Sequence, residues 1–308
     1  MSVGILGSGF GLYGYLPALN GLGERVLLPE RYRDKLLGRD DVRHLASDVE
    51  WVTDDEIVLA RSHALIISRR PVDQMNLVRR LHDFPGINRL LLEKPIAPQP
   101  AEAAEMLAIL HRGGKAVRVG FTFHYTPWAR ELADWLARTG TDGTITLDWR
   151  FRAHHYAAGL DNWKRHWRHG GGALRFYGIQ LIALLAELGY TNAISSEVLA
   201  SNHDEAESWE AVIAGPGRAN CHVRVDSNAD EKIFLATGSD STSVPPWTRR
   251  LSDPFDESPL HAKLDPRVGI LSQLCVSLLQ GAGSFPSWYR DSVDLWSAIE
   301  RQTSYSLY

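Results

Sequence analysis

Residues 3–19 read Val3-Gly-Ile-Leu-Gly-Ser-Gly-Phe-Gly-Leu-Tyr-Gly-Tyr-Leu-Pro-Ala-Leu19, which predicts a short apolar strand, a glycine-rich loop and the start of a helix. In a dinucleotide-binding β-α-β unit the first glycine allows a tight turn and the second lets the backbone approach a pyrophosphate. The helix N-terminus then faces the anion. The residues expected to meet the phosphates are Gly7, Gly9, Phe10 and Gly11.

The third glycine of this motif has two candidate positions. In the register that begins at Gly7, Leu12 stands where a small residue usually permits close packing of the helix on the strand. The full pattern is satisfied two residues later, by Gly9, Gly11 and Gly14. We prefer the first register because Gly7 directly follows an apolar run. A simple glycine-bearing turn that binds no nucleotide is the competing interpretation.

Bulk properties of the sequence narrow the class of protein. The chain has 308 residues, which is enough for two ordinary domains with buried cores. Its net charge of -4 gives no reason to expect nucleic-acid binding. Cys221 and Cys275 lie far apart among apolar residues, so neither a disulfide nor a metal cluster is predicted. Without a signal peptide or a run of about 18 apolar residues, we expect a cytoplasmic protein that does not cross a membrane.

Strands and helices alternate through the first 120 residues. Apolar runs predict strands at 24–28, 63–68, 88–95 and 117–123, and helical spacing predicts helices at 73–83 and 101–112. Such alternation is typical of a doubly wound parallel sheet. We therefore predict one domain over residues 1–120.

The pattern changes from about residue 121. Helices are predicted at 127–138, 174–188, 268–279 and 288–302, and alternating residues predict strands at 144–152, 195–199, 209–213, 220–225 and 232–237. The strands are spaced like those of an antiparallel sheet with one solvated face. Residues 239–266 are rich in proline, serine and aspartate and are predicted to form a surface excursion. A second domain is placed at residues 121–308.

Two strand ends offer residues for the adenosine side of a dinucleotide. The ribose is usually read about 20 residues beyond the glycines, at the end of the second strand. Glu30 could hydrogen-bond ribose hydroxyls, as in NAD sites, whereas Arg31 and Arg33 could hold the 2′-phosphate of NADP. A solvated charged turn is the alternative, so NAD and NADP both stay open. Ser68 and Arg69 follow another apolar strand and are expected to border the cofactor.

Four motifs follow one another along nearly the whole chain. They are Gly7-Ser-Gly-Phe-Gly11 with Leu16-Pro-Ala-Leu19 downstream, Glu93-Lys94-Pro95, Gly120-Phe121 through Pro127, and Gly170-Gly-Gly-Ala-Leu174. Together they resemble the glucose-fructose oxidoreductase/inositol dehydrogenase family, often called Gfo/Idh/MocA. The resemblance implies an N-terminal Rossmann domain and a C-terminal α/β domain with an open, mainly antiparallel sheet. It also implies NAD(P)-dependent oxidation or reduction of a sugar-like molecule, and a homodimer or higher homo-oligomer formed through the open sheet face.

The Glu-Lys-Pro motif would supply chemistry at the sheet edge. Ligands of parallel α/β sheets bind beyond the carboxyl ends of the strands, where Lys94 would stand near the nicotinamide, with Glu93 beside the cofactor. An ammonium there can hydrogen-bond the reacting oxygen and stabilise alkoxide character as hydride leaves or arrives. Partial desolvation would let it donate or accept a proton. A surface lysine before a turn proline is the competing interpretation.

The usual proton acceptor of the family is missing. After the glycine run, its dehydrogenases usually carry an aspartate, then a histidine and often a second aspartate, and these positions fall at Phe176, Gln180 and Ala183. Gln180 can hydrogen-bond but cannot accept a proton near neutral pH. Lys94 or Tyr177 could take over, since an ammonium lowers the pKa of a nearby phenol. The other candidates are His124, His154, His155 and Tyr156.

Two further interpretations stay open. One is a catalytically silent protein that binds a dinucleotide and a ligand as a regulator or sensor. The other is a reductase of a conjugated substrate that is not a sugar.

Residues 150–169 interleave cationic and aromatic side chains. Arginine pairs bidentately with carboxylate or phosphate, and indole faces stack on rings, so an anionic substrate such as a nucleotide-linked sugar or a sugar acid is our hypothesis. A solvated strand that packs its aromatics inward is the alternative. On a strand, His154 and His155 would point to opposite faces, which does not favour a metal site. The expected substrate contacts are Lys94, His124, Arg152, His154, Trp163, Arg168, Tyr177 and Gln180, with Lys94 and Tyr177 as catalytic residues.

Overall fold

The chain forms two compact units that alternate along the sequence. The structure, a computed structural model, describes residues 1–139, 141, 143–240, 244–256, 264–281 and 285–307. The first unit contains Met1–Ile96, Met106–Tyr125 and Ser258–Pro286, and the second contains Ala97–Glu105, Thr126–Glu257 and Ser287–Tyr308. The division into successive domains at residues 120 and 121 stays a prediction. No sequence motif indicates the late return of the chain to the first unit.

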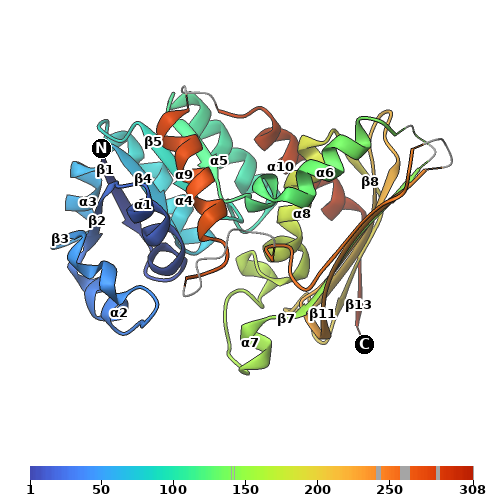
Figure 1. The fold of residues 1–308 in the computed structure, drawn as a ribbon, viewed down its shortest axis with the longest axis horizontal. Helices are drawn as coiled ribbons and strands as arrows, with labels where there is room; N and C mark the ends of the chain where they lie inside the picture. Colours follow the sequence, from blue (N-terminus) through green and yellow to red (C-terminus); the bar gives the residue numbers. More distant parts are fainter. Residues whose placement is uncertain (140, 142, 241–243, 257–263, 282–284, 308) are drawn as a thin grey trace. The chain divides into compact units, whose positions relative to one another are not determined.

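A parallel sheet of six strands forms the centre of the first unit (Figure 1). Its strands are β1 (Ser2–Leu6), β2 (Arg25–Pro29), β3 (Val49–Val52), β4 (Ala64–Ile67), β5 (Arg89–Leu92) and β6 (Ala116–Val119). They lie in the order β3-β2-β1-β4-β5-β6, and the neighbouring strands are parallel. Dinucleotide-binding doubly wound folds have this order, with the ligand crevice at the switch point between β1 and β4. The predicted doubly wound parallel sheet is confirmed.

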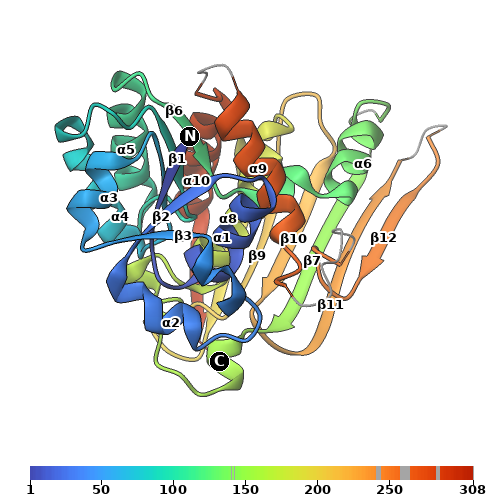
Figure 2. The same ribbon diagram turned by 60° about the vertical axis from the view of Figure 1, so that its left-hand side comes forward.

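Helices cover both faces of this sheet (Figure 2). One face carries α1 (Leu16–Gly21) and α9 (Val268–Gln280), and the other carries α3 (Asp55–Arg61) and α4 (Pro71–Arg80). Burial on both faces explains why the central strands are nearly continuous apolar runs. The unit also contains α2 (Arg33–Leu37), the C-terminal part of α5 (Pro100–Arg112), and 3-10 turns at Glu30–Tyr32, Arg43–Ser47, Leu81–Asp83 and Thr122–Tyr125.

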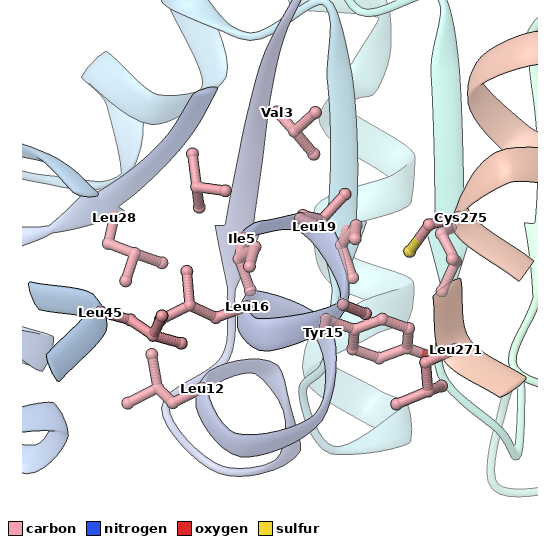
Figure 3. Packing of buried hydrophobic residues seen from close by; sticks show 14 of the residues in the cluster. Val3, Ile5, Leu12, Tyr15, Leu16, Leu19, Leu28, Leu45, Leu271 and Cys275 are labelled. Atoms are coloured by element: carbon pink, nitrogen blue, oxygen red, sulfur yellow. The ribbon is translucent and has the colours of Figure 1, made fainter. Parts of the chain in front are cut away.

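The helix α9 completes the core of the first unit, although it lies near the end of the chain. Leu271 and Cys275 are fully buried in the same apolar cluster as Ile5, Leu16 and Leu19 (Figure 3). The helices α1 and α9 also contact each other directly. The late segment therefore stabilises the N-terminal sheet by burying apolar surface against it.

The second unit is built on a mixed sheet of seven strands. They are β7 (Thr144–Arg152), β8 (Asn192–Ala200), β9 (Ser208–Ala214), β10 (Asn220–Asp226), β11 (Asn228–Ser239), β12 (Trp247–Leu251) and β13 (Thr303–Leu307), in the order β12-β11-β7-β10-β9-β8-β13. Four neighbouring pairs are antiparallel, whereas β10 is parallel to β7 and β13 is parallel to β8. The predicted open, mainly antiparallel sheet is confirmed.

The two faces of the second sheet differ in chemistry. Inward side chains such as Trp209 and Phe234 are fully buried, and the Trp128 ring lies 4.7 Å from that of Phe234. The opposite face carries charged pairs, including Arg224 with Glu210. This alternation is expected of a sheet that packs on one side only. The helices of this unit are α6 (Pro127–Leu136), α7 (His154–Ala157), α8 (Ile179–Glu187) and α10 (Trp288–Gln302).

Several elements differ from the sequence predictions. The strand predicted at 117–123 ends at Val119, and a 3-10 turn follows at Thr122–Tyr125. The strands β3 and β13 and the helix α3 are absent from the prediction because they are too short for periodicity to reveal. Residues 239–266 contain β12, which pairs with β11, so the prediction of a surface excursion is wrong for that strand. The parts of this prediction that fall on residues 241–243 and 257–263 lie outside the described residues.

Replacing Leu271 by alanine tests whether α9 belongs to the first core. The change removes a fully buried side chain, so we expect a loss of about 3 kcal/mol in the free energy of unfolding. Urea unfolding would measure it. Leu37→Ala, at a side chain that is 47% exposed, is the control and should change stability by less than about 0.5 kcal/mol. Equal, small effects of the two changes would contradict the role given to α9.

Candidate functional site

The glycine loop of the first unit has the geometry of a nucleotide-binding turn. Gly7 has a φ of 150°, and a Cβ there would lie 2.0 Å from the backbone oxygen of Ser68, so only glycine fits. A Cβ on Gly9 would meet nothing within 4 Å, which leaves its backbone open to approach. A Cβ on Gly11 would lie 2.9 Å from the side chain of Ile5. These properties match the three roles of the glycines in a dinucleotide-binding loop.

The third role therefore falls to Gly11, whereas the sequence analysis gives that position to Leu12. Leu12 is fully buried in the apolar cluster instead. Gly14 is also required, because a Cβ there would lie 2.6 Å from the ring of Phe10. The helix begins at this point with a wide π-helical turn, Gly11–Tyr15. Such turns are rare and occur often at functional sites.

Arg267, directly before α9, covers the loop residue Phe10. Its guanidinium carbon lies 4.2 Å from the centre of the Phe10 ring. Asp265 accepts hydrogen bonds from its Nε at 2.8 Å and its Nη2 at 2.7 Å. Burial alone would lower the pKa of Arg267, but hydrogen bonds to Asp265 outweigh burial and raise it. A permanently charged group from the end of the chain thus contacts the loop, and sequence reasoning missed it because nothing local links residue 267 to residue 10.

The residues after β2 and β4 share one carboxylate. Arg31 and Arg69 both form ion pairs with Asp55 at the start of α3. Glu30, in the same turn as Arg31, pairs with Arg33. Of the five predicted adenosine-side residues, Arg31 and Arg69 are thus brought together through Asp55, which the prediction does not contain, and Glu30 pairs with the predicted Arg33. Ser68, the fifth, donates its backbone N–H to the oxygen of Leu6 at 2.8 Å, beside the glycine turn.

A lysine also reaches the glycine loop. The Nζ atom of Lys35, in α2, lies 3.2 Å from the Oγ atom of Ser8. Lysine and arginine side chains therefore lie both on the loop and on the turn after β2. Cations in these places suit phosphate oxygens.

Glu93 and Lys94 follow β5 and are half-buried. The Glu93 carboxylate accepts a hydrogen bond from the Tyr15 hydroxyl and one from the Lys94 backbone N–H at 3.2 Å. Burial raises the pKa of Glu93, and burial together with the Glu93 carboxylate raises the pKa of Tyr15. The Lys94-Pro95 peptide bond is cis. His124 lies in the turn Thr122–Tyr125 of this same unit, with its ring 4.6 Å from that of Tyr125.

In the second unit, Tyr177 lies in an aromatic cluster. Its ring centre is 4.8 Å from Phe151, 4.8 Å from Phe176 and 5.8 Å from Trp149. Trp163 packs edge-on against Phe176 at 5.4 Å, so the structure brings two predicted residues, Trp163 and Tyr177, onto the same neighbour. Tyr177 belongs to a second π-helical turn, Ala173–Gly178, which follows the glycine run.

Of three cationic residues in this part of the chain, one contacts the aromatic cluster and two lie beside acidic side chains. Lys164, which the sequence prediction does not name as a site residue, lies over the Phe176 ring with its Nζ atom 5.0 Å from the ring centre. Arg152 is exposed at the end of β7, 3.5 Å from Asp230. Arg168 is exposed and lies 3.5 Å from Asp204. It lines a hollow of about 430 Å³ together with Trp167 and Tyr305. Each predicted arginine thus already faces an acidic side chain.

The histidine pair does not lie on a strand. Residues His154–Ala157 form the short helix α7, so His154 is exposed and His155 is buried, with 4% of its surface accessible. The His155 ring stacks at 6.3 Å on Tyr177. Burial, aided by the charge of Lys164, lowers the pKa of His155 to about 4. His155 is therefore a neutral imidazole at physiological pH.

Gln180 completes the predicted set. It lies in α8, three residues after Tyr177, and only 3% of its surface is accessible.

In the part of the chain that the structure describes, no three His, Cys, Asp or Glu side chains are arranged to hold a metal ion. None of the described helices is long and apolar enough to span a bilayer.

Replacing Arg267 by alanine tests its contact with the loop. The change removes the cation over Phe10 and leaves Asp265 without its guanidinium. We expect affinity for the nicotinamide dinucleotide indicated by the sequence to fall about tenfold, in line with the energy of a partly buried cation-π contact. Titration of NADH and NADPH fluorescence would measure it. Arg250→Ala, at an exposed arginine of β12, is the control, and an unchanged affinity in Arg267→Ala would contradict the contact.

Acid should destabilise the protein through His155. Its pKa is about 4 when folded and about 6.5 when unfolded, so protons favour the unfolded chain as the pH falls from 6.5 towards 4. We expect His155→Phe to remove about 2 kcal/mol of the stability loss between pH 7 and pH 4.5. Urea unfolding at both pH values would measure this difference. His154→Ala, at the exposed neighbour, removes only the last of the causes that lower the pKa of His155 and should keep most of the pH dependence. A pH dependence in His155→Phe equal to that of the wild type would refute the assignment.

Comparison with known proteins defines the fold. No protein-family model and no curated protein sequence matches the chain. KijD10, a 3-ketoreductase from Actinomadura kijaniata solved with NADP and TDP-benzene, is similar with a TM-score of 0.70 and 16% identity over 100% of this chain and 99% of that chain. Variants of KijD10 that replace a lysine or a tyrosine are similar too.

Two other solved structures share this architecture. GenD2 from gentamicin A biosynthesis, in complex with NAD, has a TM-score of 0.68 at 18% identity, covering 97% of this chain and 92% of its own. The WlbA (WbpB) dehydrogenase from Thermus thermophilus, in complex with NAD and UDP-GlcNAcA, has a TM-score of 0.67 at 16% identity, covering 100% and 97%. At these identities the likeness establishes a common fold across both units.

Proposed function

We propose that this protein is an NAD(P)-dependent oxidoreductase that transfers hydride between nicotinamide and a sugar-like, anionic small molecule. The glycine loop carries the proposal, because Gly9 leaves the backbone open at the point where the strand order reverses. KijD10, GenD2 and WlbA hold NADP or NAD on the same fold, which supports a dinucleotide here. The resemblance to Gfo/Idh/MocA enzymes in sequence motifs agrees with this assignment.

The cofactor would lie along the carboxyl edge of the parallel sheet. In this proposal the pyrophosphate meets the loop and the N-terminus of the following helix, which favours an anion. The adenosine end lies by the turn after β2, and the nicotinamide end lies by the Glu-Lys-Pro segment. The proposed cofactor residues are Gly7, Gly9, Phe10, Gly11, Glu30, Arg31, Ser68, Arg69, Glu93 and Lys94, and the cofactor is NAD or NADP.

The chemistry would rest on two proton carriers. When bound, the nicotinamide supplies or accepts the hydride. Lys94 donates a hydrogen bond to the substrate oxygen and stabilises its developing negative charge. Tyr177, in the second unit, is the proposed proton donor in reduction and the proton acceptor in oxidation. Gln180 orients the substrate through its amide and moves no proton.

Reduction of a carbonyl is the direction that these groups favour. Lysine and tyrosine ordinarily carry their protons at neutral pH, so both are ready to donate to an oxygen that gains charge. Oxidation of an alcohol needs a base that is free at that pH. KijD10 is a ketoreductase, which supports the same direction.

The substrate class follows from the cationic, aromatic surroundings of Tyr177. KijD10 holds TDP-benzene and WlbA holds UDP-GlcNAcA, both of which carry a nucleoside diphosphate. A nucleotide-linked sugar would use aromatic faces for its rings and cations for its phosphates. The proposed substrate residues are Lys94, His124, Arg152, His154, Trp163, Arg168, Tyr177 and Gln180. A homodimer or higher homo-oligomer through the open face of the seven-stranded sheet completes the proposal.

A silent dinucleotide sensor is the second candidate. The observation that favours it is the apolar setting of Gln180 in α8, together with Phe176 and Ala183 at positions where the family dehydrogenases carry carboxylates. Such a protein would bind the cofactor and a ligand without exchanging hydride.

Cofactor titration and a lysine variant separate these functions. We expect NADH or NADPH to bind with a gain in nicotinamide fluorescence, and nucleotide-linked keto sugars to oxidise the bound cofactor. Lys94→Met should lower turnover by about 10²-fold, which is more than its effect on cofactor affinity, because the other proposed cofactor residues remain. Lys232→Met, at a lysine paired with Asp253 in the second unit, is the control.

The results of these two assays distinguish an oxidoreductase from a silent dinucleotide sensor. Binding of neither nucleotide would refute both functions. Binding without turnover of any such sugar would support the sensor. Full turnover in Lys94→Met would refute the role of this lysine.

A further inference from the structure

The geometry points to Gln74 as a positioning residue for Lys94, fixing the backbone on both sides of it. This inference rests on the proposed function only in taking Lys94 as the group that meets the substrate. Gln74 lies in α4 and has no accessible surface. The helical pattern of this segment is defined by the apolar residues Met75, Leu77 and Val78, so the sequence alone does not indicate that Gln74 is buried.

The Gln74 amide forms four hydrogen bonds with the backbone of residues 93–96. Its Nε2 donates to the backbone oxygen of Glu93 at 2.9 Å, to that of Ile96 at 3.0 Å and, at the longer distance of 3.5 Å, to that of Pro95. Its Oε1 accepts the backbone N–H of Glu93 at 2.9 Å, an N–H that also points to the oxygen of Ile67 at 3.0 Å. One side chain thus uses both donors and its acceptor on residues that flank Lys94.

The hydrogen bonds from Gln74 begin where the strand β5 ends. β5 ends at Leu92, so the backbone oxygens of Glu93 and Ile96 lie beyond the strand pairing with β4 and β6. Buried backbone groups need partners, and Gln74 supplies them for this segment. Without the amide, the start of the segment that carries Lys94 would still be bound to β4 by the hydrogen bond from the Glu93 N–H to the Ile67 oxygen.

A second support acts from the opposite side of the backbone. The Glu93 carboxylate accepts the Lys94 N–H at 3.2 Å and is itself held by the Tyr15 hydroxyl. A Cβ on Gly120 would lie 2.9 Å from that carboxylate, so the residue that follows β6 approaches it closely. The N–H of Lys94 and the carbonyls on either side of it are therefore all held by side-chain hydrogen bonds. Such preorganisation keeps a proton donor in the geometry that a reaction needs.

The test reads the Lys94 side chain directly. The chain has six lysines, so reductive methylation with ¹³C-formaldehyde gives a simple NMR spectrum in which Lys94→Arg assigns one signal. In Gln74→Met we expect the Lys94 signal to sharpen and to move to the position of exposed lysines, with the other signals unchanged. Gln74→Glu keeps the acceptor for the Glu93 N–H and should give an intermediate signal.

A matched control separates positioning from stability. Met75→Ala removes a neighbouring buried side chain of the same helix, which destabilises the fold but leaves the Gln74 amide in place. We expect the Lys94 signal of this variant to stay at the wild-type position. An unchanged Lys94 signal in Gln74→Met, or an equal change in Met75→Ala, would overturn the inference. If Gln74→Met does not fold, an unchanged signal in Gln74→Glu overturns it in the same way.

The experiment is independent of the proposed function, because it needs neither cofactor nor substrate. With the cofactor assay in place, Gln74→Glu should lower kcat about tenfold while the KM for NADH or NADPH stays unchanged. Failure of both nucleotides to bind would refute the function and leave the NMR result standing. Loss of cofactor affinity with an unchanged Lys94 signal would refute the positioning role alone.

Discussion

The steric contact between Gly7 and the end of β4 constrains everything around the proposed cofactor site. β1 and β4 are parallel neighbours, and a ligand can enter only if the chain leaves β1 in a tight turn beside Ser68. A side chain on Gly7 would collide with the Ser68 backbone, so glycine is required. The turn then leaves Gly9 open and lays Gly11 against Ile5. The position of the helix N-terminus follows from this single close approach.

Two charged groups near the loop and the Glu-Lys-Pro segment are held by hydrogen-bonded partners. Arg267 pairs with Asp265, and the half-buried Glu93 carboxylate takes hydrogen bonds from Tyr15 and from the Lys94 backbone. A buried charge without such partners would strongly destabilise the fold. Groups that are paired in this way cannot reorient freely, which favours a single geometry of the loop and of the Glu-Lys-Pro segment. Preorganised dipoles and charges of this kind are what electrostatic stabilisation of a developing oxyanion requires.

Sequence reasoning recovered what depends on local patterns and missed what depends on distant contacts. Continuous apolar strands alternating with helices predicted the parallel sheet, and period-two alternation predicted the second sheet. The glycine loop was found, although Gly11 rather than Leu12 permits the close packing. Arg267 and Gln74 could not be assigned, since their partners lie far away along the chain and neither residue breaks the pattern around it. The histidine pair was misplaced on a strand because four residues of helix carry no periodic signal.

The altered motif after the second glycine run makes chemical sense as one change. In the family pattern an aspartate accompanies a histidine, and a carboxylate next to an imidazole orients it and stabilises its charged form. Once glutamine stands at position 180, a carboxylate at 176 would be a partly buried charge with nothing to orient. Phe176 instead packs edge-on against Tyr177 and Trp163 and receives the ammonium of Lys164 on its face. In the function that we propose, aromatic walls and proton donors stand where the family pattern has a proton acceptor, and such a site suits reduction of a carbonyl better than oxidation of an alcohol.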